Sequence, residues 1–457
     1  MGRNIHLYAA GSNAQGQLGT TNCDDAHTFS PCAFAGSPPG ELPPGTESIV
    51  HIAGGGNHTL ALLSRRASPD SPARAELWGC GDGSKGQLGP EYYAREAAGA
   101  RSAVFRRLRL PLAERGLEGY EPARIAACWE TSYVVLQRAG RDDALLSMGG
   151  DDFGDLGIGG AARGQGRGSA QEEHAASPVH VVDFAAVVGP SNGRVAVVDV
   201  AAGPHHVVVC LRVSRDDGLP RELAVGWGTA RHGQLGRAVA CASGRPVAFA
   251  ASPRLVQLDS DGGGDGDRGV AAVALGNQHS VFLRGSGRVS GLGSDKKGQV
   301  QGLSAFSRAC AVGCTWHGTY VLIEEAGHRA LMSAGSHAKG QLGRPLAPRG
   351  SQSASSSPAI GPVEFPPSLL RSSLRLRRFA CGSEHVLACF SDSDSSGLPG
   401  ETEVWGWGWN EHGNLGLGTL DDVHLPVKVW PPLSLANAGE VVGVWAGCGT
   451  SWIAVTT

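Results

Sequence analysis

Short apolar segments recur along the whole chain, each followed by a glycine-containing turn and a second apolar run. In IAGGGNHTLAL from Ile52, for example, small and apolar residues precede the turn and a mostly apolar run follows it. This pattern predicts a strand, a tight turn and a second strand. The other six copies begin at Ile125, Val200, Val273, Ala311, Phe379 and Val444.

A second phrase, which contains GQLG or a close variant, alternates with the first. Two clear copies are GSNAQGQLG from Gly11 and GTARHGQLG from Gly228. The residues just before several copies, such as LAVGWG and EVWGWG, predict a third strand. One repeat unit is therefore expected to be an antiparallel meander of about four strands. The remaining copies begin at Gly81, Gly149, Gly293, Gly335 and Gly408.

The two ends of the chain indicate a closed ring. An array of this many similar units must bury the faces of its units on one another. The chain opens with a GQLG phrase that has no first phrase before it, and it closes with a first phrase that has no GQLG phrase after it. Joining the two ends completes a seventh unit and removes free sheet edges. The sequence therefore predicts an all-β fold, a seven-bladed β-propeller of four-stranded antiparallel blades in one domain, 1–457.

The connections between the phrases differ greatly in length and composition. Several are polar and carry too little apolar surface to order themselves, so we expect flexible inserts near 64–75, 159–177, 259–269, 349–358 and 391–402. The insert from 91 to 122 is expected to contain one short helix. The expected blades are 49–89, 123–157, 197–236, 270–301, 308–343, 376–416, and 441–457 combined with 5–19.

One insert resembles a calcium loop superficially, because it holds four aspartates. An EF-hand would need Glu where Val270 stands, and no helices flank the segment. A calcium site is therefore not expected there. The four aspartates are Asp259, Asp261, Asp265 and Asp267.

Composition narrows the class of partner and the compartment. The formal net charge is −3, so the chain lacks the basic excess of a protein that wraps DNA or RNA, and direct nucleic-acid contact is not expected. The 11 cysteines include no CxxC pair, which favours a reducing compartment. No apolar stretch could span a bilayer, and a strand that begins near Leu7 leaves no room for a signal peptide. We expect a cytoplasmic protein, with the nucleus as a second location.

Four histidines occupy the same position of the strand–turn–strand phrase in four blades. Four imidazoles in one cleft would indicate a metal site or a general base. These four instead stand in separate blades around the ring. We therefore expect structural imidazoles, each buried and hydrogen-bonded to the backbone of a neighbouring blade. The four are His58, His206, His279 and His385.

The sequence shows no feature of an enzyme. The phrase GDGSKGQ from Gly81 lacks the Gly-Lys-Ser/Thr end of a nucleotide-binding loop and does not open a helix. Neither a nucleophile elbow nor a metal-ligand spacing occurs. We expect no catalytic residue, no metal and no cofactor.

Departures from the repeat indicate a protein-binding face. Blades 2 and 5 carry Trp129 and Trp316 where most blades have a small residue, and the turn at Trp409 adds a third indole. Since alternate turns of a meander lie on one face, these aromatic residues should share that face with nearby acidic groups, as in a binding hot spot. The alternative is that each tryptophan fills the central channel or a gap between blades. The predicted partner-binding residues are Trp129, Glu130, Trp316, His317, Glu384, Trp409, Glu411, His412 and Trp452.

The GQLG turns and the strands with Gly and His resemble the regulator-of-chromosome-condensation superfamily of seven-bladed propellers over the whole chain. Three phrases are more similar to the fungal alpha-tubulin-suppressor, or killer-toxin-insensitivity, propeller. They are ACWETSYVV with Trp129, the run from Gly382 to Gly416, and AGCGTSWIAV with Trp452. The long inserts depart from the compact members of that family.

This narrower resemblance implies a partner and a pathway. Such propellers form a heterodimer with a small CSL-type zinc/iron protein of the diphthamide pathway. The resemblance implies roles in Elongator-dependent modification of tRNA wobble uridines and in diphthamide synthesis, with the Elongator complex as a further partner. The expected contribution is non-catalytic, by binding the small metalloprotein and controlling access to its metal.

A second possibility is a guanine-nucleotide exchange factor for a Ran-like small GTPase, by analogy with the founding propeller. Fold alone is a weak reason for that function. The founder uses a protruding β-hairpin and a basic tail. This sequence has no basic tail, and none of its inserts shows clear hairpin alternation. A third class, a propeller bound to a ubiquitin ligase, has no feature here for or against it.

Overall fold

The two phrases of the repeat form the inner strands of each blade. In blade 1, β4 (His58–Arg65) is buried continuously over its first six residues. A strand that is half exposed would alternate between buried and exposed positions, whereas a blade packs on a neighbour with both faces. The structure is a computed structural model, and it describes residues 4–457 except 69, 94–99, 160–177, 190–192, 216–217, 238–243, 259–268, 326, 346–359, 393–399 and 433–438.

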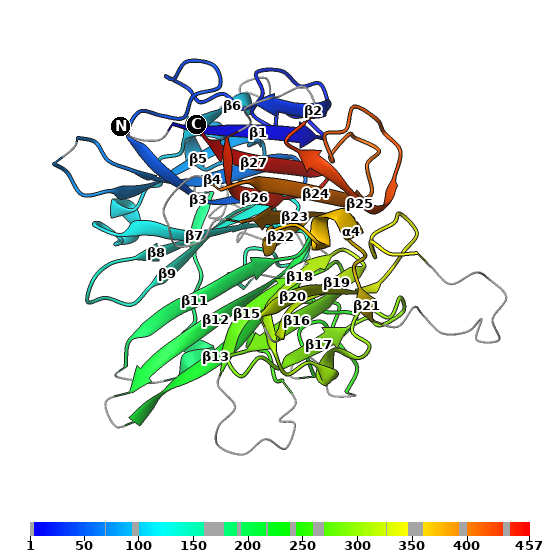
Figure 1. Cartoon of the computed structure of the whole chain (residues 1–457). Helices are drawn as coiled ribbons and strands as arrows, with labels where there is room; N and C mark the ends of the chain where they lie inside the picture. The colour runs from blue at the N-terminus through cyan, green and yellow to red at the C-terminus, as the bar shows by residue number, and fades with distance from the viewer. Residues whose placement is uncertain are drawn as a thin grey trace.

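Seven antiparallel sheets form the blades (Figure 1). From the inside outward, blade 1 contains β3 (Thr46–Gly54), β4, β5 (Arg74–Asp82) and β6 (Arg101–Arg107). Blade 2 contains β7 (Glu121–Ala127), β8 (Thr131–Gln137), β9 (Ala144–Gly149) and β10 (Val179–Val181). Blade 3 contains β11 (Val195–Ala202), β12 (His206–Arg215), β13 (Gly218–Thr229) and β14 (Phe249–Leu255). Blade 4 contains β15 (Val270–Leu275), β16 (His279–Arg284) and β17 (Val289–Gly293).

The remaining blades follow the same order. Blade 5 contains β18 (Ala309–Thr315), β19 (Gly318–Glu325), β20 (His328–Gly335) and β21 (Gly361–Pro362). Blade 6 contains β22 (Arg375–Cys381), β23 (His385–Ser391), β24 (Thr402–Gly408) and β25 (Val423–Trp430). Blade 7 contains β26 (Glu440–Ala446), β27 (Thr450–Thr456), β1 (Ile5–Gly11) and β2 (Ala26–Pro31).

The ring closes as predicted, with both ends of the chain in blade 7. β1 pairs with β27 without a break from Ile5 opposite Thr456 to Gly11 opposite Thr450. The innermost strands contact one another in succession from β3 to β26, and β26 returns to β3. The all-β, seven-bladed architecture that the repeat predicts is therefore confirmed.

The outer parts of the blades differ from the sequence prediction. Blade 4 has three strands in the part of the chain that the structure describes, whereas the other six blades have four. In those six, the outer strand lies C-terminal to the GQLG phrase and beyond the expected bounds, as β6 and β25 show. The repeat phrases carry only the three inner strands, so the outer strand had no signal of its own.

Helices are few and short in the described residues. They are α1 (Pro90–Tyr93), α3 (Ala185–Val188) and α4 (Pro367–Leu370), with 3-10 turns η2 (Ala113–Arg115) and η3 (Leu303–Ala305). None of these helices is long and apolar enough to cross a membrane. The insert from 91 to 122, where one short helix was expected, contains the end of α1, the 3-10 turn η2 and β6 in its described residues.

The expected inserts have different outcomes. The segment 64–75 is part of a hairpin, because β4 and β5 pair out to Arg65 opposite Arg74, and the amide of Arg66 donates to the carbonyl of Gly45 at 2.8 Å. The inserts at 159–177, 259–269, 349–358 and 391–402 lie largely outside the described residues. The aspartates Asp259, Asp261, Asp265 and Asp267 lie outside them too.

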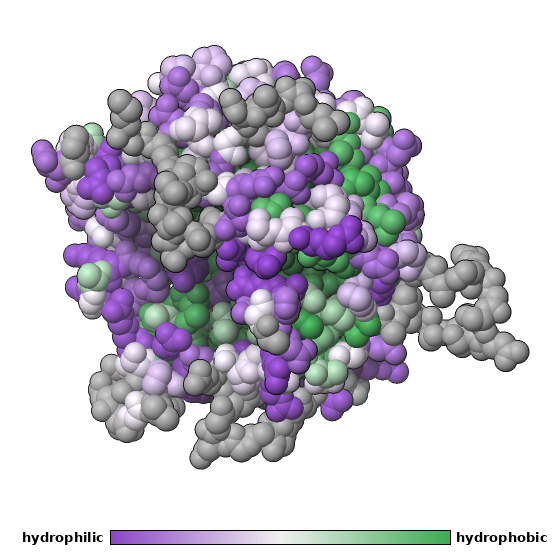
Figure 2. Space-filling view, in the orientation of Figure 1, coloured by the Kyte–Doolittle hydropathy of each residue, from purple (hydrophilic) through white to green (hydrophobic). Residues whose placement is uncertain are grey.

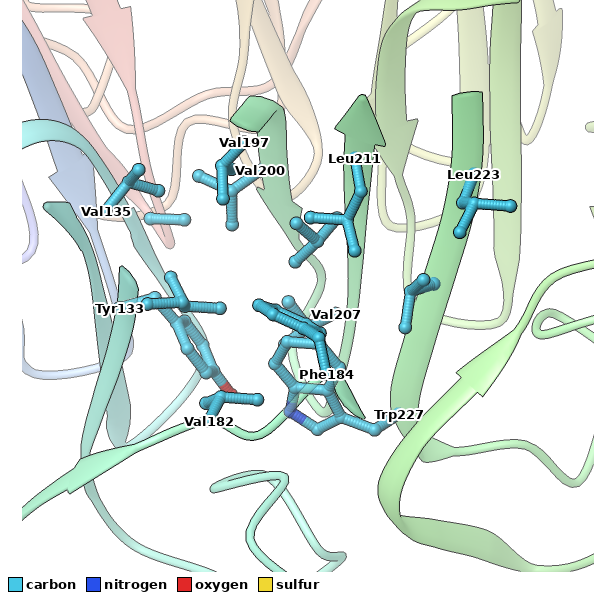
Figure 3. Packing of buried hydrophobic residues seen from close by; sticks show 14 of the residues in the cluster. Tyr133, Val135, Val182, Phe184, Val197, Val200, Val207, Leu211, Leu223 and Trp227 are labelled. Carbon is cyan, nitrogen blue, oxygen red and sulfur yellow. The ribbon is translucent and has the colours of Figure 1, made fainter. Parts of the chain in front are cut away.

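The hydrophobic core lies between the faces of neighbouring blades. Figure 3 shows one such cluster, in which Phe184 and Trp227 pack beside Tyr133 and the valines of β11 and β12. Tyr133 and Trp227 meet edge to face, with ring centroids 6.0 Å apart. The outside of the ring is mostly polar in the view of Figure 2, with hydrophobic residues in separate patches.

Candidate functional site

One face of the ring gathers the turns that carry the predicted binding residues. We call it the turn face; it consists of the turns between the first and second strands and between the third and fourth strands of each blade. One backbone hydrogen bond joins the two turns in every blade, for example from the Trp409 amide to the Glu384 carbonyl at 2.9 Å. The equivalent donor and acceptor pairs are Ser12–Gly449, Asp82–Asn57, Gly150–Glu130, Thr229–His205, Ser294–Gln278 and Ser336–His317.

Glycine opens each GQLG phrase because of this hydrogen bond. Gly408 has φ +102, in the left-handed region, and a Cβ there would lie 2.4 Å from the Glu384 carbonyl oxygen. Gly149 has φ +124, and its Cβ would lie 2.2 Å from the Glu130 carbonyl oxygen. A side chain would therefore be strained and would also displace the acceptor.

The glutamine of GQLG holds the turn from within, a role that the sequence did not reveal. Gln341 is buried, and its Oε1 accepts the amide of Lys339 at 2.7 Å. Its backbone carbonyl accepts the indole Nε1–H of Trp407 in the next blade at 2.9 Å. In blade 2 the residue is Asp155, which accepts the Phe153 amide at 3.1 Å. The repeat thus couples turn geometry to blade packing.

The four repeat histidines are structural, as expected, and each joins two blades. All four are fully buried, and each Nε2 lies within hydrogen-bond distance of a hydroxyl in the next blade. The partner of Nε2 is therefore a side-chain hydroxyl rather than the backbone group that we expected. The pairs are His58–Ser132 at 2.8 Å, His206–Ser280 at 3.2 Å, His279–Thr319 at 3.1 Å and His385–Ser451 at 3.0 Å.

Burial keeps these imidazoles neutral. Desolvation lowers the pKa of His58, His279 and His385 to about 4, and it lowers the pKa of His206 to about 3. Among the described residues, no group of three or more His, Cys, Asp or Glu side chains is arranged to hold a metal. The histidines therefore contribute to packing between blades rather than to acid–base chemistry.

Trp129 and Trp316 meet each other although they come from blades 2 and 5. Their ring centroids lie 6.0 Å apart, with the planes at 49°. Because blades 2 and 5 are not neighbours in the ring, the two indoles meet across the central channel. Both are half-buried, and a Cβ on Gly56 of blade 1 would lie 2.8 Å from the Trp129 ring. The structure thus favours the alternative in which these tryptophans fill the channel, at its turn-face mouth.

Glu384 and His317 form a closed polar cluster between blades 5 and 6. His317 Nδ1 makes a short contact with Glu384 Oε1, and Gln341 Nε2 donates to Glu384 Oε2 at 2.9 Å. The Glu384 side chain is only 13% exposed, against 34% for His317. Most of the hydrogen-bonding capacity of this carboxylate is therefore already used inside the chain.

The turn of blade 6 presents Trp409, Glu411 and His412 together. The Trp409 and His412 rings meet edge to face at 5.3 Å, and His412 Nδ1 lies 2.7 Å from Asp25 Oδ2 of blade 7. Glu411 Oε1 accepts Lys339 Nζ at 2.8 Å. This hydrogen bond lowers the pKa of Glu411 and raises the pKa of Lys339. Both side chains are exposed, so a partner could displace the pair at little cost.

Trp452 does not belong to a binding surface. It is 0% exposed and packs in the core between blades 7 and 1, with Trp78 and Phe105 in the same cluster. It pairs with Trp445 across β26 and β27. The prediction that Trp452 contacts a partner is therefore wrong, because no atom of it reaches the surface.

Comparison with known proteins agrees with this geometry. The regulator of chromosome condensation (RCC1) repeat model matches residues 6–62 and 401–453. A protein of Bos taurus named secretion-regulating guanine nucleotide exchange factor is 25% identical over 97% of this chain and 81% of its own length. An RCC1 repeat-containing protein of Schizosaccharomyces pombe is 26% identical over 98% of both chains.

The crystal structure of Prp20p from Saccharomyces cerevisiae has the same fold. It superposes with a TM-score of 0.64 and 18% sequence identity, over 100% of this chain and 92% of Prp20p. Prp20p has binding properties to Gsp1p and histones. The chain is thus a seven-bladed propeller in which residues 6–62 and 401–453 match the RCC1 repeat.

Proposed function

We propose that this chain is a non-catalytic, protein-binding propeller that docks a small GTPase on its turn face and promotes release of the bound guanine nucleotide. The main support for this proposal is the similarity to the secretion-regulating guanine nucleotide exchange factor, which extends over 97% of this chain. A match of that extent includes the whole ring rather than single repeats. The 25% identity makes the exchange activity a proposal for this chain.

The turn face supports docking because it carries side chains beyond those that hold the ring together. Trp409 is half-buried and Glu411 is 59% exposed, and the Trp409 amide is joined to the turn of Glu384. An indole next to exchangeable charged groups is typical of a protein-binding hot spot. Docking of a GTPase on a surface does not require a catalytic cavity.

The structure contains one long hairpin, on the face opposite the proposed docking face. The sequence indicated no hairpin among the inserts, yet β12 and β13 are the two longest strands in the described residues, and they pair out to Arg215 opposite Gly218. β12 has 10 residues where the equivalent β4 has 8, an excess of about 7 Å at 3.3 Å per residue. This hairpin ends on the opposite side of the ring, the hairpin face, which consists of the turns between the second and third strands.

Nucleotide release provides the direct test. The full chain is added to a panel of small GTPases loaded with a fluorescent GDP analogue, in the presence of excess GTP. Exchange activity predicts at least tenfold faster release from one member at micromolar propeller. Release at the intrinsic rate from every member would contradict the proposal.

The docking face is tested separately by a pair of variants. Trp409→Ala should weaken binding of the responding GTPase at least tenfold, with an unchanged melting temperature of the propeller, because the indole lies on a surface turn. Leu370→Ala is the matched control: this apolar side chain of α4 is 63% exposed, and α4 precedes the end of β22 that lies away from the turn face. Equal loss of binding in both variants would show that Trp409 has no special role.

The narrower prediction from the sequence names a different partner, a CSL-type metalloprotein, and with it Elongator-dependent tRNA modification and diphthamide synthesis. Two of the three phrases that carry this resemblance contain tryptophans with structural positions, since Trp452 is buried and Trp129 packs on Trp316. Co-purification followed by calorimetry tests this partner. Tight one-to-one binding of the metalloprotein, without faster nucleotide release from any GTPase, would replace the exchange proposal.

A further inference from the structure

Two sectors of the channel mouth have related compositions but differ in how completely their carboxylates are hydrogen-bonded. One lies between blades 5 and 6 and contains Trp316, His317 and Glu384. The other lies between blades 2 and 3 and contains Trp129, Glu130 and His205. Each has a tryptophan followed by a charged or ionisable residue, and the next blade supplies the complementary type, with the positions of His and Glu exchanged. The two sectors can therefore be compared atom by atom.

The sector between blades 5 and 6 is satisfied internally. Glu384 contacts His317 through one oxygen and accepts Gln341 Nε2 at 2.9 Å through the other. Gln341 is the glutamine of the GQLG phrase, and its amide supplies the hydrogen that the carboxylate needs. No further cation is required there.

The sector between blades 2 and 3 lacks that amide, because Asp155 stands where blade 5 has Gln341. Asp155 Oδ2 accepts the amide of Phe153, but Oδ1 is buried without a hydrogen bond. The Asp155 side chain is only 4% exposed, and its Oδ1 lies 3.7 Å from His205 Nδ1. A buried carboxylate oxygen without a donor is costly, and a donor from outside the chain would stabilise it.

A second carboxylate lies on the adjoining turn of blade 2, between β7 and β8. Glu130 is half-buried, and it forms no side-chain hydrogen bond or ion pair with the part of the chain that the structure describes. Its Oε2 would lie 3.2 Å from a Cβ placed on Gly150, at the start of the turn that ends with Asp155. The sector thus carries two carboxylates: Asp155 faces the imidazole of His205, and Glu130 has no ion-pair partner among the described residues.

Aromatic residues belong to the same sector. The Trp129 amide donates to the Pro204 carbonyl at 2.9 Å, which joins the backbone of Trp129 to the turn that carries His205. The Phe153 ring lies 4.6 Å from the His205 ring and is 40% exposed. Planar cations stack on such rings while donating to carboxylates in the same plane.

We infer that this sector binds the guanidinium of an arginine carried by the partner protein. An arginine supplies several fixed N–H donors for Asp155 and Glu130 and a flat face for the rings, whereas a bare metal ion would need three or more ligands that the described residues do not offer. The inference rests on the proposed function only in taking the turn face as the docking face. It adds that the partner contributes a basic residue at the channel mouth.

The test uses the full chain and two peptides, without any GTPase. Acetyl-Gly-Arg-Gly-amide is the probe, and acetyl-Gly-citrulline-Gly-amide is the control with the same shape and no charge. Calorimetry should show binding of the arginine peptide and at least tenfold weaker binding of the citrulline peptide. Equal affinity of the two peptides would overturn the inference.

Variants then place the peptide in the sector. Asp155→Gln introduces the residue found at this position in most blades, so the turn keeps its hydrogen bond while the carboxylate is lost. Asp155→Gln should weaken binding of the arginine peptide at least tenfold. If that variant does not fold, Glu130→Gln tests the loss of the second carboxylate independently. Glu325→Gln makes the same charge change on the hairpin-face end of β19 and should change nothing. Unchanged binding in both Asp155→Gln and Glu130→Gln would overturn the inference.

The outcomes separate this inference from the proposed function. Faster nucleotide release without arginine-peptide binding would leave the exchange proposal standing and remove the arginine site. Arginine-peptide binding without exchange activity would support the site and remove the GTPase as partner.

Discussion

Four of the seven interfaces between blades have a histidine clamp, and three do not. The clamped interfaces follow blades 1, 3, 4 and 6, where the imidazole reaches a hydroxyl of the next blade. The interfaces after blades 2 and 5 instead use an indole: Trp227 donates to the Asp155 carbonyl at 2.8 Å, and Trp407 donates to the Gln341 carbonyl at 2.9 Å. At the interface between blades 7 and 1, the Thr59 hydroxyl donates to the Gln17 carbonyl at 2.7 Å.

The difference shows how one fold accepts two kinds of interface, because neighbouring residues change together with the histidine. Two residues after the repeat position, blades without histidine carry Tyr133, Tyr320 or Trp452. The clamped blades carry smaller apolar residues there, and all seven side chains are fully buried. A large aromatic residue thus occupies the layer that the imidazole would otherwise share. The smaller residues are Leu60, Val208, Val281 and Leu387.

A glycine three residues before the histidine completes the clamp. A Cβ on Gly382 would lie 2.1 Å from His385 Cε1, and a Cβ on Gly276 would lie 2.1 Å from His279 Cε1. Blades 2 and 5 have no imidazole at this place, and there the glycine is replaced by Cys128 and Thr315. The clamp is therefore a set of three positions rather than a single residue.

A fall in pH should reveal the largest difference in stability between the two kinds of interface, because acid protonates the histidines of all four clamps at once. The folded-state pKa values of about 3 to 4 lie below the ordinary value of 6.5. The unfolded chain therefore binds more protons below pH 6.5. Stability from the clamps is complete above pH 6.5 and is lost as pH falls toward 4, by up to about 1.4 kcal/mol per pH unit for each histidine.

Urea unfolding at pH 7.0, 6.0 and 5.0 measures this loss. His385→Gln removes one titrating group, so its stability should fall less steeply with pH than that of the parent chain. An identical slope in the two proteins would contradict the assignment of the acid sensitivity to the clamps.

Loss of a single clamp at neutral pH should have the next largest effect. His206→Ala removes a fully buried ring and its hydrogen bond with the Ser280 hydroxyl, so we expect a loss of about 3 kcal/mol. His328→Ala is the control, because that side chain is exposed. It should change the free energy of unfolding by less than about 0.5 kcal/mol. Similar losses of stability in both variants would show that the buried histidine clamp is no more important for stability than an exposed histidine.

The indole interfaces should respond more mildly to loss of their hydrogen bond. Trp407→Phe keeps most of the buried ring but removes the donor to the Gln341 carbonyl, and we expect a loss of about 1 to 2 kcal/mol. The same change in Trp227 should cost a similar amount at the interface between blades 2 and 3. Denaturant midpoints compare the two, and a loss equal to that of His206→Ala would show that the interfaces are not different in kind.

Much of this organisation could be predicted from the sequence, since periodic turns and apolar runs specify the ring and its closure. The hydroxyl partners were missed, although a signal exists: Ser132, Ser280, Thr319 and Ser451 each follow the repeat position in the blade after a histidine. The burial of Trp452 also had a signal, because Tyr133 and Tyr320 occupy the same repeat position as large apolar residues of a strand.

Other features had no sequence signal. Trp129 and Trp316 meet only because the closed ring brings blades 2 and 5 to opposite sides of a narrow channel. The orphaned oxygen of Asp155 likewise depends on three-dimensional packing, although the change from glutamine to aspartate in the GQLG phrase marks the place.

Hydrogen–deuterium exchange of the propeller, alone and with the small GTPase that responds in the release assay, tests the central claim most directly. If the turn face is the docking face, protection should appear in the turns around Glu130, His205 and Trp409. The ends of the hairpins β4–β5 and β12–β13 should exchange as in the free protein. Protection confined to those hairpin ends, with unchanged exchange at the channel mouth, would contradict the account.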